Sequence, residues 1–405
     1  MVKNGFSQFQ GKKVLLLQGP LGAFFKNLAL DLEAAGATVF KINFNGGDWF
    51  FYPTKAINFN QRLSEWPHFY DTFIQTHHID VVLLFGDCRP IHQVAHAISV
   101  ERNLQIGVFE EGYIRPDYIT LEQYGVNANS KIPQSPEFYQ HLPDTPINEV
   151  ASIGKSFWFA ALWGMIYFTA CAIAKPYFRH YQHHRSLSIW QGLFWLRSFG
   201  RKWLYGFQQK NELETLIKER DKKYFLLALQ VHNDAQIHHH SDFFSVDAFI
   251  SEVINSFSLN APPDCHLVIK HHPLDRGFNH YGHLIHVICQ RQGLKNRIHY
   301  IHDLHLPTLL AHAKGVVVIN STVGLSALDH ACPVITCGNA IYDFEGLTYQ
   351  GSLDSFWKNA DSFKVDQNLY FKFLSYLINH TQINGNYYKR LHHVNNHTGI
   401  NWVLL

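Results

Sequence analysis

The chain has 405 residues, of which 46% are hydrophobic and 16% are charged. This composition is typical of a folded globular protein and excludes an intrinsically disordered chain, and the length predicts two domains because it exceeds what one hydrophobic core usually fills. The formal net charge of +2 is too small to indicate a nucleic acid as partner. Histidine, with 28 residues, and the aromatic residues, at 15%, are unusually frequent, which points to a specialised site or surface.

Cysteine usage and the first residues bear on the compartment. The six cysteines are scattered and form no CxxC pair, so neither a zinc site nor a disulfide framework is predicted, and a reducing compartment is favoured. The opening "MVKNGFSQFQGKK" lacks the continuous apolar segment of a signal peptide. We therefore expect a cytoplasmic protein.

The first 145 residues alternate between expected strands and helices. Residues 14–17 form a continuous apolar run, as in a parallel strand that is covered on both faces. A glycine-containing turn, a helix over 24–35 and a strand over 38–44 follow. The same order returns with a strand at 80–85, a helix at 90–101 and a strand at 105–109. This alternation predicts a parallel, Rossmann-like sheet in an N-terminal domain, residues 1–145.

The second half repeats the alternation. A strand in "YFLLALQVHND", a helix in "SVDAFISEVINSFSL" and a strand in "HLVIKHHPLD" are followed by helix, strand, turn, helix and strand over residues 306–338. A second Rossmann-like domain is expected over residues 216–365. Residues 366–405 are expected to form C-terminal helices that cross back to the first domain.

The middle region, residues 146–215, has a different composition. Residues 156–174 carry no charge, and the stretch after them is both basic and aromatic. Nineteen uncharged residues can just span a bilayer, but one crossing would separate the two α/β domains, so we expect a helix that is buried or lies in the membrane interface. The basic residues would then face anionic headgroups, namely Arg179, Arg185, Arg201 and Lys202. The alternative is an ordinary interdomain helical layer with solvated basic side chains.

Two glycine-containing turns of the first domain are candidate ligand contacts. "QGPLGAFF" follows the first strand, where glycine lets a ligand approach the backbone, but it is not a GxGxxG fingerprint. "INFNGGDWFFY" ends the second strand. Both turns supply predicted substrate-binding residues, namely Gln18, Gly19, Asn45 and Asp48. A plain turn remains the alternative for the second stretch.

Acidic and basic residues follow the next two strands. "FGDCRP" supplies Asp87 and Arg89, and "FEEGYIRPDYITLE" supplies Glu111 and Arg115. Open α/β sheets bind ligands at the carboxyl ends of their strands. An arginine there can hold a carboxylate or phosphate with two hydrogen bonds, and a carboxylate beside it would stay ionised as a nucleophile. The alternative is a lattice of internal ion pairs.

The second domain offers a candidate phosphate site. "KHHP" places three basic side chains at a strand end, where a histidine can also protonate a leaving group. "INSTVG" is a hydroxyl-rich turn that opens a helix. Together they predict a site for a nucleoside monophosphate, with candidate residues Gln230, Lys270, His272, Pro273, Asn320, Ser321 and Thr322.

Several other chemistries are disfavoured. The histidine-rich residues 232–242 do not have the spacing of a metal site, and the chain contains no DxD motif of a metal-assisted diphosphate-sugar enzyme. It also lacks the GxSxG turn of serine hydrolases. No metal and no cofactor are therefore expected.

These motifs together resemble the capsular polysaccharide biosynthesis and export family, and in particular its single-domain members that prime group 2-type capsules. The resemblance extends from Gln18 to about Trp357 and includes "GLTYQGSLDSFW". It implies a retaining β-Kdo transferase of GT-B architecture, α/β with two Rossmann-like parallel-sheet domains facing a cleft. The donor would be CMP-Kdo and the acceptor a lysophosphatidylglycerol-type lipid at the inner face of the inner membrane.

The resemblance also implies roles for single residues. His272, Pro273, Ser321 and Thr322 match motifs by which bacterial sialyltransferases hold CMP. Polymerising relatives have an acidic-Asp-Gly-aromatic motif where this chain has "EEGY". Glu111 is thus the expected nucleophile, with Asp87 as the alternative, and Glu110 is expected to be structural because its side chain would point to the other face of the strand.

Two other functions remain open at this stage. One is a non-catalytic assembly or export factor that uses the GT-B scaffold to bind capsule chains, with other capsule biosynthesis and export proteins as partners. The other is a nucleotide-sugar epimerase, which would need a diphosphate donor.

Overall fold

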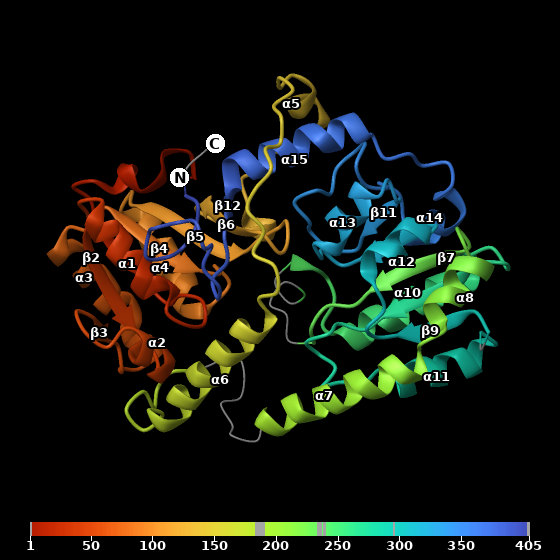
Figure 1. The fold of residues 1–405 in the computed structure, drawn as a ribbon, viewed down its shortest axis with the longest axis horizontal. Coiled ribbons are helices and arrows are strands. Elements are labelled where there is room, and N and C mark those ends of the chain that lie inside the picture. The colour runs from red at the N-terminus through yellow and green to blue at the C-terminus, as the bar shows by residue number, and fades with distance from the viewer. Residues whose placement is uncertain (1, 183–190, 233–236, 238–239, 295, 403–405) are drawn as a thin grey trace. The chain divides into compact units, whose positions relative to one another are not determined.

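The computed structural model describes residues 2–182, 191–232, 237, 240–294 and 296–402 (Figure 1). The chain forms two compact units. Unit 1 comprises residues 1–131, 145–189 and 375–405, and unit 2 comprises residues 132–144 and 190–374.

Unit 1 is built on a seven-stranded sheet with the order β12-β6-β5-β4-β1-β2-β3. Five strands are parallel: β1 (Lys13–Leu16), β2 (Thr38–Asn43), β3 (Ile57–Asn58), β4 (Val81–Phe85) and β5 (Gln105–Glu111). Two are antiparallel to their neighbours: β6 (Tyr118–Gln123) and β12 (Gln382–Asn384).

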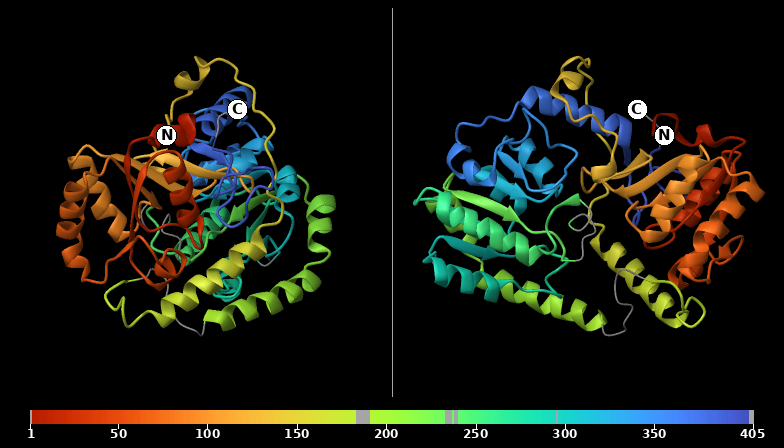
Figure 2. Two further views of the ribbon diagram at one scale, coloured as in Figure 1. Left: turned by 60° about the vertical axis from the view of Figure 1, so that its left-hand side comes forward. Right: turned by 180° about the vertical axis from the view of Figure 1, so that it is seen from behind.

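Helices cover both faces of this sheet (Figures 1 and 2). Val14 and Leu16 of β1 pack in one core with α1 (Phe24–Ala34). Leu15 and Leu17 pack in another with α3 (Trp66–His77) and α4 (Pro90–Glu101). Both faces of β1 are thus buried, which explains its continuous apolar sequence.

The rest of unit 1 consists of short helices and one long one. The short elements are η1 (Val2–Phe9), α2 (Gly46–Phe51), η2 (Leu63–Glu65) and η3 (Asn127–Asn129). The long helix is α6 (Phe157–Ile173), which packs on α2.

Unit 2 has a five-stranded, fully parallel sheet with the order β11-β10-β7-β8-β9. Its strands are β7 (Tyr224–Ala228), β8 (His266–Lys270), β9 (Ile298–Ile301), β10 (Gly315–Val318) and β11 (Val334–Thr336). Its helices are α5 (Pro136–Gln140), α7 (Gln191–Gln208), α8 (Glu212–Glu219), α10 (Val246–Asn260), α11 (Gly282–Gln292), α12 (Leu306–His312), α13 (Val323–Asp329) and α14 (Leu353–Asn359).

The predicted α/β class is confirmed, since each unit is built on a Rossmann-like sheet whose strands are wholly or mainly parallel. The GT-B type of that class stays a prediction. The cleft that this class places between the domains stays a prediction. The expected middle segment, residues 146–215, is divided, since α6 belongs to unit 1 and α7 to unit 2. None of the helices within the described residues combines the length and apolar character needed to cross a bilayer.

The C-terminal part differs from the helices that the sequence predicted. One helix, α15 (Gln367–Thr381), runs from unit 2 into unit 1 and is followed by β12 and irregular chain. The irregular chain is anchored by the buried Asp31, whose carboxylate accepts hydrogen bonds from the backbone N–H groups of His397 (2.6 Å) and Thr398 (2.8 Å). Strand pairing and this anchor fix the segment without a further helix.

Candidate active site

Three predicted substrate-binding residues of unit 1 lie in a buried hydrogen-bond network. The Tyr167 hydroxyl of α6 donates to Asp48 Oδ1 (2.8 Å) and accepts from Asn45 Nδ2 (2.8 Å). Gln18 Nε2 donates to Asp48 Oδ2 (3.1 Å). The groups that these side chains contact are therefore protein groups, and the network fastens α6 to α2.

The glycines of the same turn serve this packing. A Cβ added to Gly46 would lie 2.2 Å from the carbonyl oxygen of Ala170, and one on Gly47 would lie 2.5 Å from the Tyr167 ring. Gly19 is likewise crowded, since a Cβ there would lie 2.6 Å from the ring of Phe25. Close approach of helices explains these glycines without a ligand.

Asp87, the alternative nucleophile, is buried and engaged. Its Oδ2 accepts hydrogen bonds from the Val126 backbone N–H (3.1 Å) and from Asn129 Nδ2 (3.1 Å). The carboxylate thus holds the turn after β6. An attack on a sugar through this oxygen would cost two hydrogen bonds, which favours Glu111 for that role.

Glu110 and Glu111 end β5 in different environments. Glu111 Oε1 accepts a hydrogen bond from the Tyr388 hydroxyl (2.9 Å). Glu110 Oε1 accepts one from the Glu111 backbone N–H (2.9 Å). The pKa of Glu110 is raised to about 7, mainly by burial. The Glu111 backbone N–H and the charge of Arg89 oppose this rise, and the charges of Glu111 and Asp87 contribute to it. Two adjacent carboxyl groups, one of them with a raised pKa, are the usual equipment of a double displacement on a sugar.

Sequence reasoning missed Glu110, which it took to be structural. The side chain lies at the end of β4, where a Cβ on Gly86 would be 3.5 Å from Glu110 Oε2, and it feels the charges of Asp87 and Arg89. The side chains of Glu110 and Glu111 do point to opposite faces of β5, but candidate site residues lie on both faces at this end of the strand. The duplicated acid in "FEEGY" was the signal.

The two arginines beside these carboxylates bond to neutral oxygens. Arg89 Nη1 donates to Gln18 Oε1 (2.7 Å), and Arg115 Nε donates to the carbonyl oxygen of Gly112 (3.1 Å). Across the described part of the chain, no ion pair within 4.0 Å links either arginine to a carboxylate. The expected alternative, a lattice of ion pairs between strand ends, is not what the structure shows.

In unit 2 the predicted phosphate site lies at the ends of three neighbouring strands. Gln230, after β7, donates from Nε2 to Asn320 Oδ1 (3.0 Å), and so joins the ends of β7 and β10. Ser321 Oγ accepts from the Val323 backbone N–H (3.2 Å), with the half-buried Thr322 between them.

The basic residues after β8 face different surroundings. His271 is buried with Nδ1 2.7 Å from the Tyr300 hydroxyl, and burial lowers its pKa to about 4, so it is neutral and cannot act as a cation. Burial also lowers the pKa of Lys270. His272 Nδ1 accepts the Leu274 backbone N–H (3.2 Å), which places the ring proton on Nε2. Pro273 follows on the surface.

A histidine–aspartate pair at this edge was not predicted. His232 Nδ1 lies 2.5 Å from Asp275 Oδ1, and Asp275 is fully buried and also accepts the Tyr281 hydroxyl at Oδ2 (3.1 Å). His232 follows β7, the central strand of the sheet, between the predicted residues of β10 and β8. From the sequence, the histidine-rich loop that contains His232 was considered only as a metal site.

The described residues of that loop form no metal centre. Residues 233–236 and 238–239 of the histidine-rich segment lie outside the residues that the structure describes. Among those described, no three histidine, cysteine or acidic side chains converge as metal ligands would.

The basic residues of the middle segment lie in different surroundings. Arg201 Nη1 donates to the carbonyl oxygen of Arg276 (2.8 Å), and Arg197 donates to those of Gly277 and Phe278 (both 2.7 Å). The Arg201 guanidinium thus fastens α7 to the loop after "KHHP", and its contact with lipid headgroups stays a prediction. Arg179 and Lys202 are exposed. Arg185 lies outside the described residues.

Comparison with known proteins gives consistent matches along the chain. The family model "Capsule polysaccharide biosynthesis protein" matches residues 80–388. The capsule polysaccharide export protein KpsS of Escherichia coli is 44% identical over 380 residues, which cover 93% of this chain and 97% of that protein. The capsule polysaccharide modification protein LipB of Neisseria meningitidis serogroup B is 39% identical over 388 residues, covering 94% and 92%. Among solved structures, the β-Kdo 2,7 transferase KpsC of Thermosulfurimonas dismutans matches at 16% identity and a TM-score of 0.43, with 93% of each chain covered.

Proposed function

Since the chain belongs to the capsule polysaccharide biosynthesis protein family, we propose that it is a retaining glycosyltransferase that moves Kdo from CMP-Kdo to a lysophosphatidylglycerol-type lipid. The observation that carries this proposal is the pair of carboxyl groups at the end of β5, with the pKa of Glu110 raised to about 7 beside Glu111. The edge of a parallel α/β sheet where strands end is the usual place for such a site.

The proposed reaction is a double displacement in unit 1. Glu111 attacks the anomeric carbon of Kdo, the bond from that carbon to the CMP phosphate breaks, and CMP leaves with the bonding electron pair. A hydroxyl of the lipid then attacks the same carbon and releases Glu111, while Glu110 takes the hydroxyl proton. Arg89 and Arg115 hold the Kdo carboxylate.

The donor nucleotide is assigned to unit 2. His272 donates from Nε2 to the single phosphate of CMP, and Lys270 adds positive charge at the same strand end. Asn320, Ser321 and Thr322 supply amide and hydroxyl groups after β10. A monophosphate has no second phosphate for a metal to bridge, so binding of CMP should require no metal.

The protein is proposed to act as a peripheral protein at the inner face of the inner membrane. Helix α7 exposes Phe199, Trp203 and Phe207, which are four residues apart and so share one face; Trp203 and Phe207 are 79% and 77% exposed. Aromatic side chains on one face of a helix suit the bilayer interface.

The test is incubation with CMP-Kdo and a short-chain lysophosphatidylglycerol, followed by mass spectrometry. We expect the lipid to gain the mass of Kdo, and Glu111→Gln to bind CMP but form no product. In the absence of acceptor, a Kdo adduct on a peptide that contains Glu111 is expected. Intact binding of CMP with no product under any condition would refute the transfer reaction.

A non-catalytic export factor is the second candidate, because the 44% identical E. coli protein is named for export. It predicts binding of capsule chains that is indifferent to Glu111→Gln. Product formation by the wild-type protein decides against it.

A further inference from the structure

Helix α6 has one buried face and one exposed apolar face. Gly164, Tyr167 and Cys171 are buried against α2. On the other side an apolar stripe is exposed, consisting of Trp158 (64%), Leu162 (46%), Met165 (59%) and Ile173 (76%). No residue of the helix is charged. An exposed stripe of this kind marks a contact surface.

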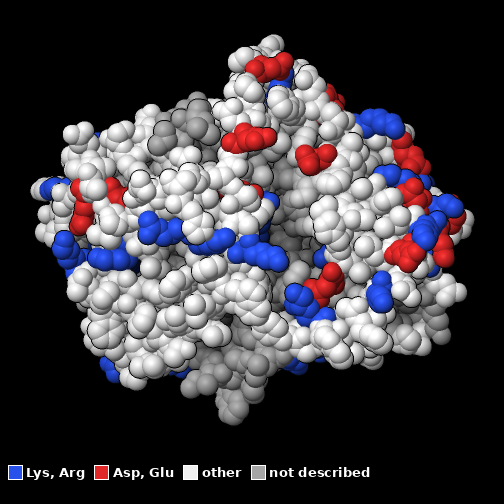
Figure 3. Space-filling model, viewed as in Figure 1, with Lys and Arg blue, Asp and Glu red and all other residues white. Residues whose placement is uncertain are grey.

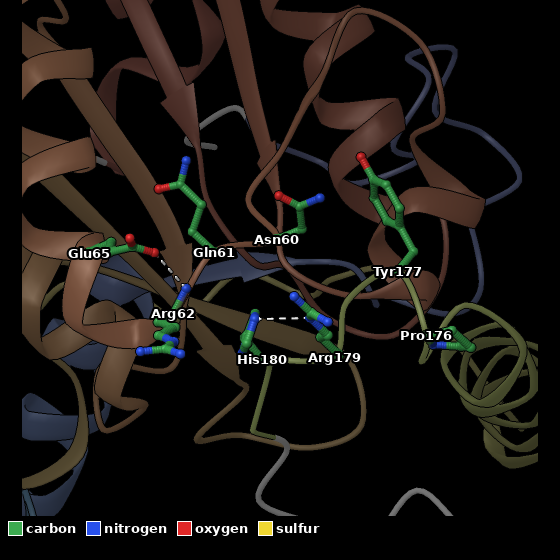
Figure 4. Close-up of a pocket in the computed structure, with 8 residues that line it drawn as sticks. All are labelled: Asn60, Gln61, Arg62, Glu65, Pro176, Tyr177, Arg179 and His180. Atoms are coloured by element: carbon green, nitrogen blue, oxygen red, sulfur yellow. Dashed lines mark hydrogen bonds between the residues drawn. The ribbon is translucent and has the colours of Figure 1, made fainter.

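A pocket of about 470 Å³ lies beside the end of this helix, wholly within unit 1 (Figure 4). It is lined by Arg62, Arg179, His180, Asn60, Gln61 and Pro176, which follows Ile173 by three residues. Arg179 Nε donates a hydrogen bond to His180 Nε2 (3.1 Å), which leaves its two terminal nitrogens for a ligand. As far as the described residues extend, neither arginine forms an ion pair with a carboxylate. The one acidic wall residue, Glu65, accepts a hydrogen bond from the Arg62 backbone N–H (2.9 Å).

An aromatic rim connects the pocket to the apolar surface. The ring of Tyr177, a wall residue, lies 5.7 Å from that of Trp49 at a tilt of 30°, and both are exposed, at 47% and 40%. Phe50 beside them is 58% exposed. Tryptophan and tyrosine with one apolar and one polar end are typical of the bilayer interface.

The charges of unit 1 beside this surface are mostly positive. Residues 150–182 contain Lys155, Lys175 and Arg179 and no Asp or Glu, and Glu65 is the acid of the pocket wall. On the face drawn in Figure 3, a row of Lys and Arg side chains crosses unit 1, and the surface below it, over α6, is almost uncharged. An uncharged apolar surface bordered by cations is complementary to an anionic bilayer.

We propose that the pocket binds the phosphate of an anionic phospholipid headgroup, with the α6 stripe and the Trp49–Tyr177 rim inserted among the neighbouring lipids. The bidentate fork of an arginine suits a phosphate diester. Glu65 is the only acid on the wall and is turned to the backbone, so the phosphate meets no opposing free carboxylate there. This docking rests on the proposed placement of the protein at the membrane surface and names the contact, but it does not depend on the transfer reaction.

Sedimentation of the full chain with vesicles tests the docking. We expect binding to phosphatidylcholine vesicles that contain phosphatidylglycerol, and much weaker binding to phosphatidylcholine alone. Each basic residue at an anionic surface contributes about fivefold, so Arg62→Gln with Arg179→Gln should weaken binding about 30-fold. Met165→Gln with Ile173→Gln should weaken binding to both kinds of vesicle, because it removes inserted apolar area.

The matched control is Arg291→Gln with Lys358→Gln, which removes the same charge from exposed positions of unit 2. Its binding should stay within about twofold of wild type, since neither residue lines the pocket or belongs to α6. Wild-type affinity in the Arg62/Arg179 variant, or equal binding to both vesicle types, would overturn the proposal. The proposal would also be overturned if the wild-type protein bound inorganic phosphate but no vesicles, and if the Arg62/Arg179 variant lost that phosphate binding. Vesicle binding without Kdo transfer would support the docking and count against the transferase alone.

Discussion

Replacement of Glu110 by glutamine should leave stability almost unchanged in acid and increase it at pH 8. The pKa of Glu110 in the folded protein is about 7, against 4.5 for the free side chain, with desolvation as the main cause. Between these values the folded state holds a proton that the unfolded chain has lost. The free energy of unfolding therefore falls as the pH rises from about 4.5 to 7, and it is constant above that range.

The size of the effect follows from the pKa difference. A difference of about 2.5, at about 1.36 kcal/mol for each, corresponds to about 3 kcal/mol of stability that the wild-type protein loses on going from acid to pH 8. Glutamine keeps the oxygen that accepts the Glu111 backbone N–H but does not ionise. Glu110→Gln should thus be within about 1 kcal/mol of wild type at pH 5 and up to about 3 kcal/mol more stable at pH 8.

Urea denaturation of both proteins at several pH values measures this difference, with fluorescence and circular dichroism followed in parallel because the chain has two units. Glu122→Gln is the matched control. Burial also raises the pKa of Glu122 to about 7, and Tyr113 and Ser130 donate hydrogen bonds to it, so its replacement should stabilise the protein at pH 8 in the same way. Turnover should fall strongly in Glu110→Gln and stay near wild type in Glu122→Gln. A stability difference that is equal at pH 5 and pH 8 would refute the assignment of the bound proton to Glu110.

Three further changes test other parts of the structure. His232→Gln should lower the rate of Kdo transfer about 100-fold or more, as loss of an acid–base group does, and full activity would remove His232 from the mechanism. Tyr167→Phe leaves the buried Asp48 Oδ1 without its hydrogen bond and should lower the free energy of unfolding by about 1–3 kcal/mol, measured by denaturation; an unchanged value would contradict the role given to the network. Arg201→Gln should lower the melting temperature, whereas the neighbouring Lys202→Gln, on the exposed side of α7, should not; equal melting temperatures would argue against the clamp.

The fold could be predicted from the sequence because its strands are buried on both faces. A continuous apolar run such as residues 14–17 is typical of a strand that is covered on both faces, and the strand is observed over Lys13–Leu16. The helix predicted over 24–35 is observed over Phe24–Ala34. The C-terminal part was harder, since β12 exists only through its pairing with β6, more than 250 residues earlier in the chain.

The site could be predicted only as a set of strand ends. Asn45 and Asp48 do stand at one, but their partner Tyr167 is about 120 residues away, so the sequence could not show that a protein side chain already occupies them. Likewise "KHHP" does not tell which histidine turns inward. The buried one is His271, because its Nδ1 lies 2.7 Å from the hydroxyl of Tyr300 on the neighbouring strand β9. The local sequence pattern thus predicts the edge of the sheet at which the site lies. Tertiary contacts decide which side chains at that edge remain available to bind a ligand.

The hydrogen bonds of unit 2 orient His272 and His232 differently. His272 receives a backbone N–H at Nδ1, so even the neutral ring carries a proton on Nε2 and can donate it to a phosphate oxygen. His232 directs Nδ1 at the buried Asp275, which leaves its Nε2 as the ring nitrogen that can face a nucleotide. The two rings follow the adjacent strands β8 and β7. In the proposed reaction the phosphate gains negative charge as CMP leaves, and the Nε2–H of His272, oriented by its backbone contact, donates to it without a metal ion.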